Sequence, residues 1–178
     1  QIDGTASAAL WHLDLYRDRT VEITPPEDQT ARRLKRVPLD LGAGPLGKLL
    51  AREPGRSVLL IFADPGSEPT EHLLREMLDW AEDFRALPCR ILLMAEDAAH
   101  PTVSLWQAAF PQAELSSLRD PEALAALHRQ MQVGDLRLPF VICADRSGQG
   151  VYADANYRIG LAQTLFKIQS VPDAPAFR

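Results

Sequence analysis

Cysteine is scarce in this sequence: among 178 residues there are only two, Cys89 and Cys143. They lie too far apart to form a Cys-x-x-Cys pair, and the four histidines are scattered rather than spaced as zinc ligands are. We interpret His12, His100 and His128 as ordinary surface or core residues. The composition therefore predicts neither a metal site nor a dithiol motif, and it implies no cofactor.

Long apolar runs and positive charge are also in short supply. No stretch approaches the roughly 18 apolar residues of a membrane helix, so we expect no membrane span in this chain. The formal net charge is −5, whereas a nucleic-acid surface needs a clustered basic face. The one basic cluster, at residues 32–36, is interpreted as part of a solvated connector. Because the chain does not begin with Met, we expect a piece of a longer protein, either a mature secreted form or one domain.

The most informative stretch covers residues 57–84, which read as a buried strand, a tight turn and an amphipathic helix. Residues 58–63 are continuously apolar, as in a strand that is covered on both faces. Pro69 suits the first turn of a helix, where its missing N–H would have no partner. Residues 90–94 read as the next buried strand, which completes a right-handed parallel crossover. The helix between them carries one apolar stripe: Leu73, Met77, Trp80, Ala81 and Phe84.

The chain divides into three parts. Residues 1–25 read as a β-hairpin with strands at 7–16 and 20–24, and the polar residues 26–36 as a connector. We expect residues 37–178 to form a single domain. Its further elements are predicted as strands at 37–41, 113–116, 140–144 and 149–153 and as helices at 45–52, 102–110, 121–131 and 160–169.

Residues 57–84 resemble the thioredoxin family, whose members have an apolar strand, an aromatic residue, a few small residues, a Cys-x-x-Cys and then a helix. In this sequence the four motif positions hold Ser67, Glu68, Pro69 and Thr70. The strand, short helix and glycine turn that come before are similar to the entry of peroxiredoxins and of membrane-anchored thiol oxidoreductases. The resemblance implies an α/β fold, a thioredoxin-like α/β/α sandwich with a mixed sheet that follows the N-terminal hairpin. It also implies a cis peptide bond before Pro139.

The resemblance extends to the fold but not to the chemistry. Disulfide exchange needs a thiolate at a helix N-terminus and a second thiol to resolve the mixed disulfide, and Ser67 and Thr70 supply only hydroxyls. We interpret these hydroxyls as caps for the unpaired amides of the helix. Peroxidase chemistry of the peroxiredoxin kind would need a Thr-x-x-Cys in the same turn, and Thr70 stands where that cysteine would be.

Two other chemistries are conceivable at this corner. A serine hydrolase would need a base beside Ser67, but His72 lies five residues along the same helix and is expected to point away. Asp64, Glu68 and His72 could converge on a metal ion, although their spacing matches no strong ligand motif. We therefore predict no catalytic residue and no metal ligand.

The two cysteines are predicted to lie on either side of the central strand, two strand spacings or roughly 9.5 Å apart. A disulfide needs Cα atoms within about 7 Å of each other. We therefore expect buried, unpaired thiols that behave as small apolar side chains. The alternative hypothesis makes this chain a divergent thiol oxidoreductase or peroxidase that uses Cys89 or Cys143 with an external thiol.

What remains of the site is a helix N-terminus beside the expected cis-proline. In thioredoxin-like modules without cysteines, this place sometimes still binds an extended peptide or an anion through backbone amides. We predict a vestigial groove between residues 64–70, which begin with Asp64, and the edge formed by Leu138, Pro139 and Phe140. Its partner would be a peptide, a protein or another domain of the parent protein.

Residues 138–168 also resemble the C-terminal module of large bacterial transglutaminase-like proteins, which ends in a Tyr-x-Ile-Gly-x-Gly-x-x-Leu-Leu run. Ala162 replaces the second glycine and Phe166 the second leucine, and the matching residues are Tyr157, Ile159, Gly160 and Leu165. Residues 6–16 resemble the piece that precedes that module. The resemblance implies a secreted or envelope location, and it places any transglutaminase chemistry outside this chain. We therefore predict a redox-inactive accessory domain of a larger bacterial protein that mediates interdomain or protein contacts.

Overall fold

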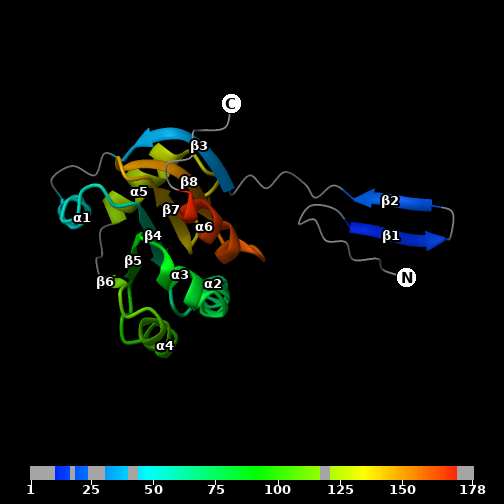
Figure 1. Ribbon diagram of the computed structural model, residues 1–178, viewed down its shortest axis with the longest axis horizontal. Helices are drawn as coiled ribbons and strands as arrows, with labels where there is room; N and C mark the ends of the chain where they lie inside the picture. The colour runs from blue at the N-terminus through cyan, green and yellow to red at the C-terminus, as the bar shows by residue number, and fades with distance from the viewer. Residues whose placement is uncertain (1–10, 17–18, 24–30, 40–43, 117–120, 172–178) are drawn as a thin grey trace.

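The computed structural model describes residues 11–16, 19–23, 31–39, 44–116 and 121–171 (Figure 1). Its strands are β1 (Trp11–Tyr16), β2 (Arg19–Ile23), β3 (Ala31–Pro38), β4 (Val58–Ala63), β5 (Arg90–Ala95), β6 (Glu114–Ser116), β7 (Phe140–Ala144) and β8 (Gln149–Ala155). Its helices are α1 (Pro45–Leu50), α2 (Glu68–Asp79), α3 (Ala81–Ala86), α4 (Pro101–Ala109), α5 (Pro121–Met131) and α6 (Leu161–Ser170). None of the helices in the described part of the chain has the length and apolar character of a membrane span.

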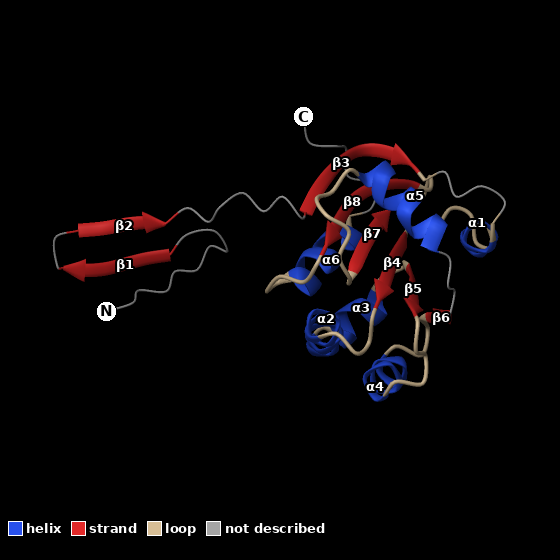
Figure 2. Ribbon diagram, turned by 180° about the vertical axis from the view of Figure 1, so that it is seen from behind, coloured by secondary structure: helices blue, strands red, loops and turns tan. Residues whose placement is uncertain are grey.

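Six of the strands form one open mixed sheet in the order β3-β8-β7-β4-β5-β6 (Figure 2). β4 pairs in parallel with β5 and antiparallel with β7, and β5 pairs in parallel with β6. α2 and α3 connect β4 to β5, which confirms the predicted crossover. β1 and β2 pair antiparallel in a two-stranded sheet of their own, as predicted, although residues 7–10 and 24 of that hairpin lie outside the described residues.

Helices cover both faces of the six-stranded sheet and make a three-layer α/β/α sandwich (Figures 1 and 2). Alternate residues of a strand point to opposite faces. Leu59 and Ile61 of β4 therefore pack with α2, α3, α4 and α6, whereas Leu60 and Phe62 pack with α1 and α5. β4 is buried along its whole length, which explains why its sequence is continuously apolar. The fold class predicted from the sequence is confirmed.

The first edge strand of this sheet begins earlier than predicted. We expected residues 31–36 to be connector, but β3 starts at Ala31 and pairs antiparallel with β8. The register shifts before Val37, where Arg36 has a positive φ of 27°, so the strand carries a bulge. Edge strands are often charged because charge discourages pairing with other chains. The polarity of these residues was therefore a misleading sign of a connector.

The helix predicted after β4 is interrupted at Trp80. α2 ends at Asp79 and α3 begins at Ala81, with Trp80 between them at φ −107° and ψ 16°. The predicted apolar stripe is buried apart from Trp80, which is half-buried and packs against the Phe166 ring of α6 with centroids 5.5 Å apart. Helical spacing thus identified the buried face, but it did not reveal the break, because the same face stays buried after it.

Candidate functional site

The four motif positions lie at the corner between β4 and α2. Ser67 is the N-cap of α2, with extended backbone angles of φ −91° and ψ 138°, and Pro69 lies in the first helical turn. The carbonyl of Asp64 accepts from the Ser67 N–H at 3.0 Å, and its carboxylate accepts from the Gly66 N–H at 3.2 Å. These bonds close a tight turn, and we call residues 64–70 the corner loop.

The hydroxyls of the corner loop contact each other rather than the helix amides. Ser67 Oγ lies 2.9 Å from the Asp64 carbonyl oxygen and 3.0 Å from Thr70 Oγ1. Thr70 Oγ1 accepts from the Asp64 N–H at 3.3 Å and is fully buried. Ser67 makes no side-chain capping bond to α2. The predicted capping role is therefore wrong, because both hydroxyls are used to hold the turn before the helix.

The arrangement of the corner loop does not support hydrolysis or metal binding. His72 Nε2 lies 3.4 Å from Glu68 Oε1, and the His72 ring stacks on Tyr157 with centroids 5.4 Å apart. The candidate base is thus engaged with groups other than the Ser67 hydroxyl. Within the described ranges, no three His, Cys, Asp or Glu side chains gather closely enough to hold a metal ion, and this includes Asp64, Glu68 and His72.

The other predicted edge of the groove, residues 138–140, lies at the same end of the sheet. The Leu138–Pro139 peptide bond is cis. Phe140 pairs with Phe62 in the antiparallel ladder of β4 and β7, with ring centroids 5.9 Å apart. Asp64 follows Phe62 by two residues and Leu138 precedes Phe140 by two, so the ladder brings the corner loop and Leu138 together. Pro139 and Phe140 are buried and Leu138 is half-buried, so Leu138 is the side chain of this edge that reaches solvent.

A third segment, residues 156–160 between β8 and α6, borders the same place, and the sequence had suggested no role for it. The N–H of Asn156 donates to the Pro139 carbonyl at 2.9 Å, and Tyr157 carries the ring that stacks on His72. Asn156 has a positive φ of 93°, a conformation that asparagine tolerates better than most residues. The available sequence signal was this asparagine, which follows β8 directly.

Glu76 of α2 anchors the end of this segment. Its Oε1 accepts from the N–H of Gly160 at 2.8 Å, and its Oε2 accepts from the N–H of Ala162 at 3.2 Å. Gly160 is the N-cap of α6 at φ 84° and has no side chain to do this itself. Glu76 thus supplies the cap from another helix. Just before this cap, Ile159 leaves its side chain 90% exposed.

A polar triad of buried Asp154, buried Tyr152 and half-buried Arg158 anchors the segment from its other side. Asp154 is fully buried and accepts from Arg158 Nε and from the Tyr152 hydroxyl, both at 3.0 Å. Arg158 Nη2 also donates to the Tyr152 oxygen at 2.9 Å. Burial raises the pKa of Tyr152, and the Asp154 carboxylate acts in the same direction. The phenol therefore stays protonated and keeps donating to Asp154.

Cys89 and Cys143 are buried, free thiols, as predicted. β4 lies between β5, which Cys89 precedes, and β7, which carries Cys143. Burial raises the pKa of Cys89 to about 11, although a backbone hydrogen bond and the Arg56 guanidinium act in the opposite direction. Burial also raises the pKa of Cys143. Both thiols are therefore protonated at neutral pH and are poor nucleophiles.

Solved structures similar to this chain include a secreted thiol-disulfide isomerase from Corynebacterium glutamicum. It is 11% identical with a TM-score of 0.52, over 83% of this chain and 93% of the isomerase. A DsbF homologue from Corynebacterium diphtheriae is 13% identical with a TM-score of 0.51, over 82% of this chain and 95% of its own. A scan against models of protein families and a comparison with curated proteins found no match. At this level of identity the likeness shows the fold alone, and the chain has a thioredoxin-like fold.

Proposed function

We propose that this chain is a redox-inactive, thioredoxin-like accessory domain that mediates interdomain or protein contacts. The observation that carries the proposal is the pair Ser67 and Thr70, whose hydroxyl oxygens lie 3.0 Å apart at the positions that hold the two sulfurs of a Cys-x-x-Cys motif. Disulfide exchange proceeds through a thiolate and a mixed disulfide. A hydroxyl pair can form neither, so this corner has no route for that reaction.

The state of the two cysteines supports the same proposal. With a pKa of about 11, roughly one Cys89 thiol in ten thousand is ionised at pH 7. Cys143 is fully buried on β7. Reactive cysteines are usually partly exposed and have a lowered pKa, and these two thiols have neither property.

We propose the groove between the corner loop and residues 138–140 as the contact surface. Asp64 and Glu68 are exposed at one edge and Leu138 is half-buried at the other. Ile159, 90% exposed, follows Asn156, which is bonded to Pro139. Acidic and apolar groups side by side suit an extended segment that alternates basic and apolar side chains.

We further propose that the parent is a bacterial transglutaminase-like protein with its active site outside this chain, located in the envelope or secreted. The sequence run that includes Tyr157 and Gly160 supports this parent. The secreted isomerase among the similar structures is consistent with an extracytoplasmic location.

The redox part of the proposal is tested by insulin reduction and by peroxide consumption, each with dithiothreitol as the electron donor. We expect the wild type, Cys89→Ser and Cys143→Ser to give the same rates as dithiothreitol alone. The competing candidate is a divergent thiol oxidoreductase or peroxidase, and the Arg56 guanidinium favours it because it lowers the pKa of Cys89 against the effect of burial. A wild-type rate above the reagent that either serine variant abolishes would establish that candidate instead.

The contact surface is tested by amide chemical shifts during titration with a short peptide of alternating lysine and leucine. We expect the shifts to cluster in the corner loop and residues 138–140 and to disappear in Leu138→Asp. The matched control is Leu105→Asp, because Leu105 is also exposed, at 59%, but lies on α4. Shifts that Leu138→Asp leaves unchanged would contradict this location.

A further inference from the structure

A cavity of about 470 Å³ lies at the end of β4 that is opposite to the corner loop. Val58, the first residue of β4, and its cross-strand partner Ala144 are part of its lining. The corner loop begins after Ala63, so β4 separates the two places by about 17 Å. Leu39 after β3 and Leu50 of α1 add apolar side chains to the lining. The volume is within the range of sites for small organic molecules, about 300–1,000 Å³.

The charged side chains that line this cavity are mostly positive, whereas the chain as a whole is negative. Among the described residues that line it, Arg56 and Arg146 are positive and Glu53 is negative, whereas the whole chain has a formal net charge of −5. All three are exposed. The cavity thus combines an apolar wall with a mouth where two arginines outnumber one glutamate, which suits a molecule that has an acidic head and an apolar body.

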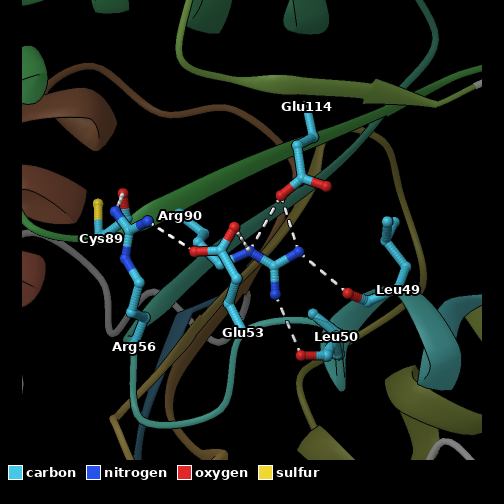
Figure 3. A network of polar contacts seen from close by, with 7 residues as sticks. All are labelled: Leu49, Leu50, Glu53, Arg56, Cys89, Arg90 and Glu114. Atoms are coloured by element: carbon cyan, nitrogen blue, oxygen red, sulfur yellow. Dashed lines mark hydrogen bonds and ion pairs between the residues drawn. The ribbon is translucent and has the colours of Figure 1, made fainter.

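The contacts of the Arg56 guanidinium within the protein are weak enough for it to bind a ligand instead. Arg56 Nη1 donates to Glu53 Oε2 at 2.7 Å, while Glu53 Oε1 lies 4.0 Å from Arg90 Nε (Figure 3). Glu53 would therefore keep a positive neighbour if Arg56 bound another anion. The second contact of Arg56, to the Cys89 carbonyl, is long at 3.4 Å. The exposed Arg56–Glu53 pair is also weak by nature, since solvent screens it.

Arg90 fixes the wall of the cavity in place. Its side chain is only 2% exposed and donates to the carbonyls of Leu49 and Leu50 at the end of α1, at 3.0 and 3.1 Å (Figure 3). Its Nε and Nη2 donate to Glu114 Oε1 of β6 at 2.9 and 2.7 Å. These bonds tie α1 to the sheet. A preformed wall of this kind lowers the ordering cost of binding.

We propose that this cavity is a binding site for an amphipathic carboxylate. The carboxylate group lies between Arg56 and Arg146, and the apolar body packs on the side of Val58 and Leu50. A guanidinium donates two parallel bonds to a carboxylate, which gives direction as well as attraction. The site is separate from the corner loop, and its occupancy does not depend on the accessory role proposed above.

The experiment uses decanoate as the probe, with isothermal titration and amide shifts as the two readouts. We expect saturable binding below the micelle concentration, with shifts clustered in residues 50–58 and 144–148. Decan-1-ol, which has the same chain without the charge, should bind about tenfold or more weakly, because it lacks the charge-assisted bonds. Equal binding of acid and alcohol, no saturation, or shifts elsewhere in the chain would overturn the proposal.

Two arginine variants test where the carboxylate of decanoate binds, and a third variant tests whether its apolar chain occupies the cavity. Arg56→Gln and Arg146→Gln are exposed substitutions and should each weaken decanoate binding about tenfold. Ala51→Trp, at another exposed lining residue, should block binding by filling the space. Arg85→Gln on α3 is the matched control and should bind as the wild type does. If either arginine variant at the cavity binds decanoate as tightly as Arg85→Gln, the assignment is wrong.

Discussion

The Oγ atoms of Ser67 and Thr70 are joined by a 3.0 Å hydrogen-bond contact, where two sulfurs would form a bond of about 2 Å. A hydroxyl both donates and accepts, so these side chains also engage the carbonyl and the N–H of Asp64. The corner is thus held by polar contacts that a reducing agent cannot break. On the proposal that this domain is redox-inactive, the two hydroxyls stand where the reactive sulfurs would be, and they close the corner without a route to disulfide exchange.

Cys89 makes the stability of the protein sensitive to alkaline pH. Its pKa is raised by burial to about 11 from the usual 9.0, so between these values the unfolded thiol loses its proton while the folded thiol keeps it. The unfolded state then binds fewer protons, and the free energy of unfolding falls as pH rises from 9 towards 11. Urea unfolding across this range should show a shallower fall for Cys89→Ala than for the wild type. Parallel curves for the two proteins would contradict the raised pKa.

Replacing Arg90 should cost more stability than replacing Arg56, the other arginine in Figure 3. Arg90→Met leaves the carbonyls of Leu49 and Leu50 and the partly buried Glu114 carboxylate without their donor, and we expect a loss of about 3 kcal/mol in the free energy of unfolding. Arg56→Met removes only an exposed pair and should cost about 0–1 kcal/mol. Urea unfolding of both variants is the measurement, and equal losses would show that the buried network contributes little.

At the scale of elements, Glu76 joins α2 to the start of α6. Glu76→Ala leaves the Gly160 and Ala162 amides without their acceptor and removes a negative charge from the positive end of a helix, so we expect a loss of about 1–2 kcal/mol. Glu76→Gln should lose less because the amide keeps one acceptor. Glu96→Ala, at an exposed loop position, is the control. Thermal or urea unfolding that does not distinguish Glu76→Ala from Glu96→Ala would refute this cap.

Strands that are buried on both faces could be predicted from the sequence. Features that depend on contacts with residues far away in the chain could not. β4, β5 and β7 are covered on both faces, so their apolar runs gave their positions closely. Within the described part of the chain β3 pairs with β8 alone, and its basic sequence resembled a connector. The cap by Glu76 is a contact with α6, and Trp80, at the break between α2 and α3, packs against Phe166 of the same helix. No local pattern records such contacts.

The candidate site, too, could be predicted only in part from the sequence. The motif positions and Leu138 could be placed by aligning strand, turn and helix, since the β4–β7 ladder fixes their proximity. The partners of the Ser67 and Thr70 hydroxyls could not be predicted, because helix amides and turn groups compete for the same oxygens. The 156–160 segment was missed because its position depends on contacts with distant parts of the chain, among them the bond from Asn156 to the Pro139 carbonyl and the cap by Glu76.

At the scale of the whole molecule, we propose that residues 1–25 are a unit separate from the thioredoxin-like domain, whose sheet includes β3. A chain that begins at residue 26 should then keep the melting temperature of the domain. A chain that begins at residue 39 lacks β3, so β8 keeps β7 as a partner but becomes an exposed edge; this chain should melt more than about 10 °C lower or aggregate through that edge. Calorimetry of both chains is the measurement. A large loss in the first chain, or none in the second, would contradict this division.

If this domain keeps the fold of a thiol oxidoreductase without its reactive sulfurs, insulin reduction should distinguish the wild type from the double variant Ser67→Cys/Thr70→Cys. The Ser67 and Thr70 oxygens are already in contact, so we expect the double variant to form a disulfide that dithiothreitol reduces and to accelerate insulin reduction. The wild type should give only the rate of dithiothreitol itself. Catalysis by the wild type, or a folded double variant without any gain in rate, would contradict the account.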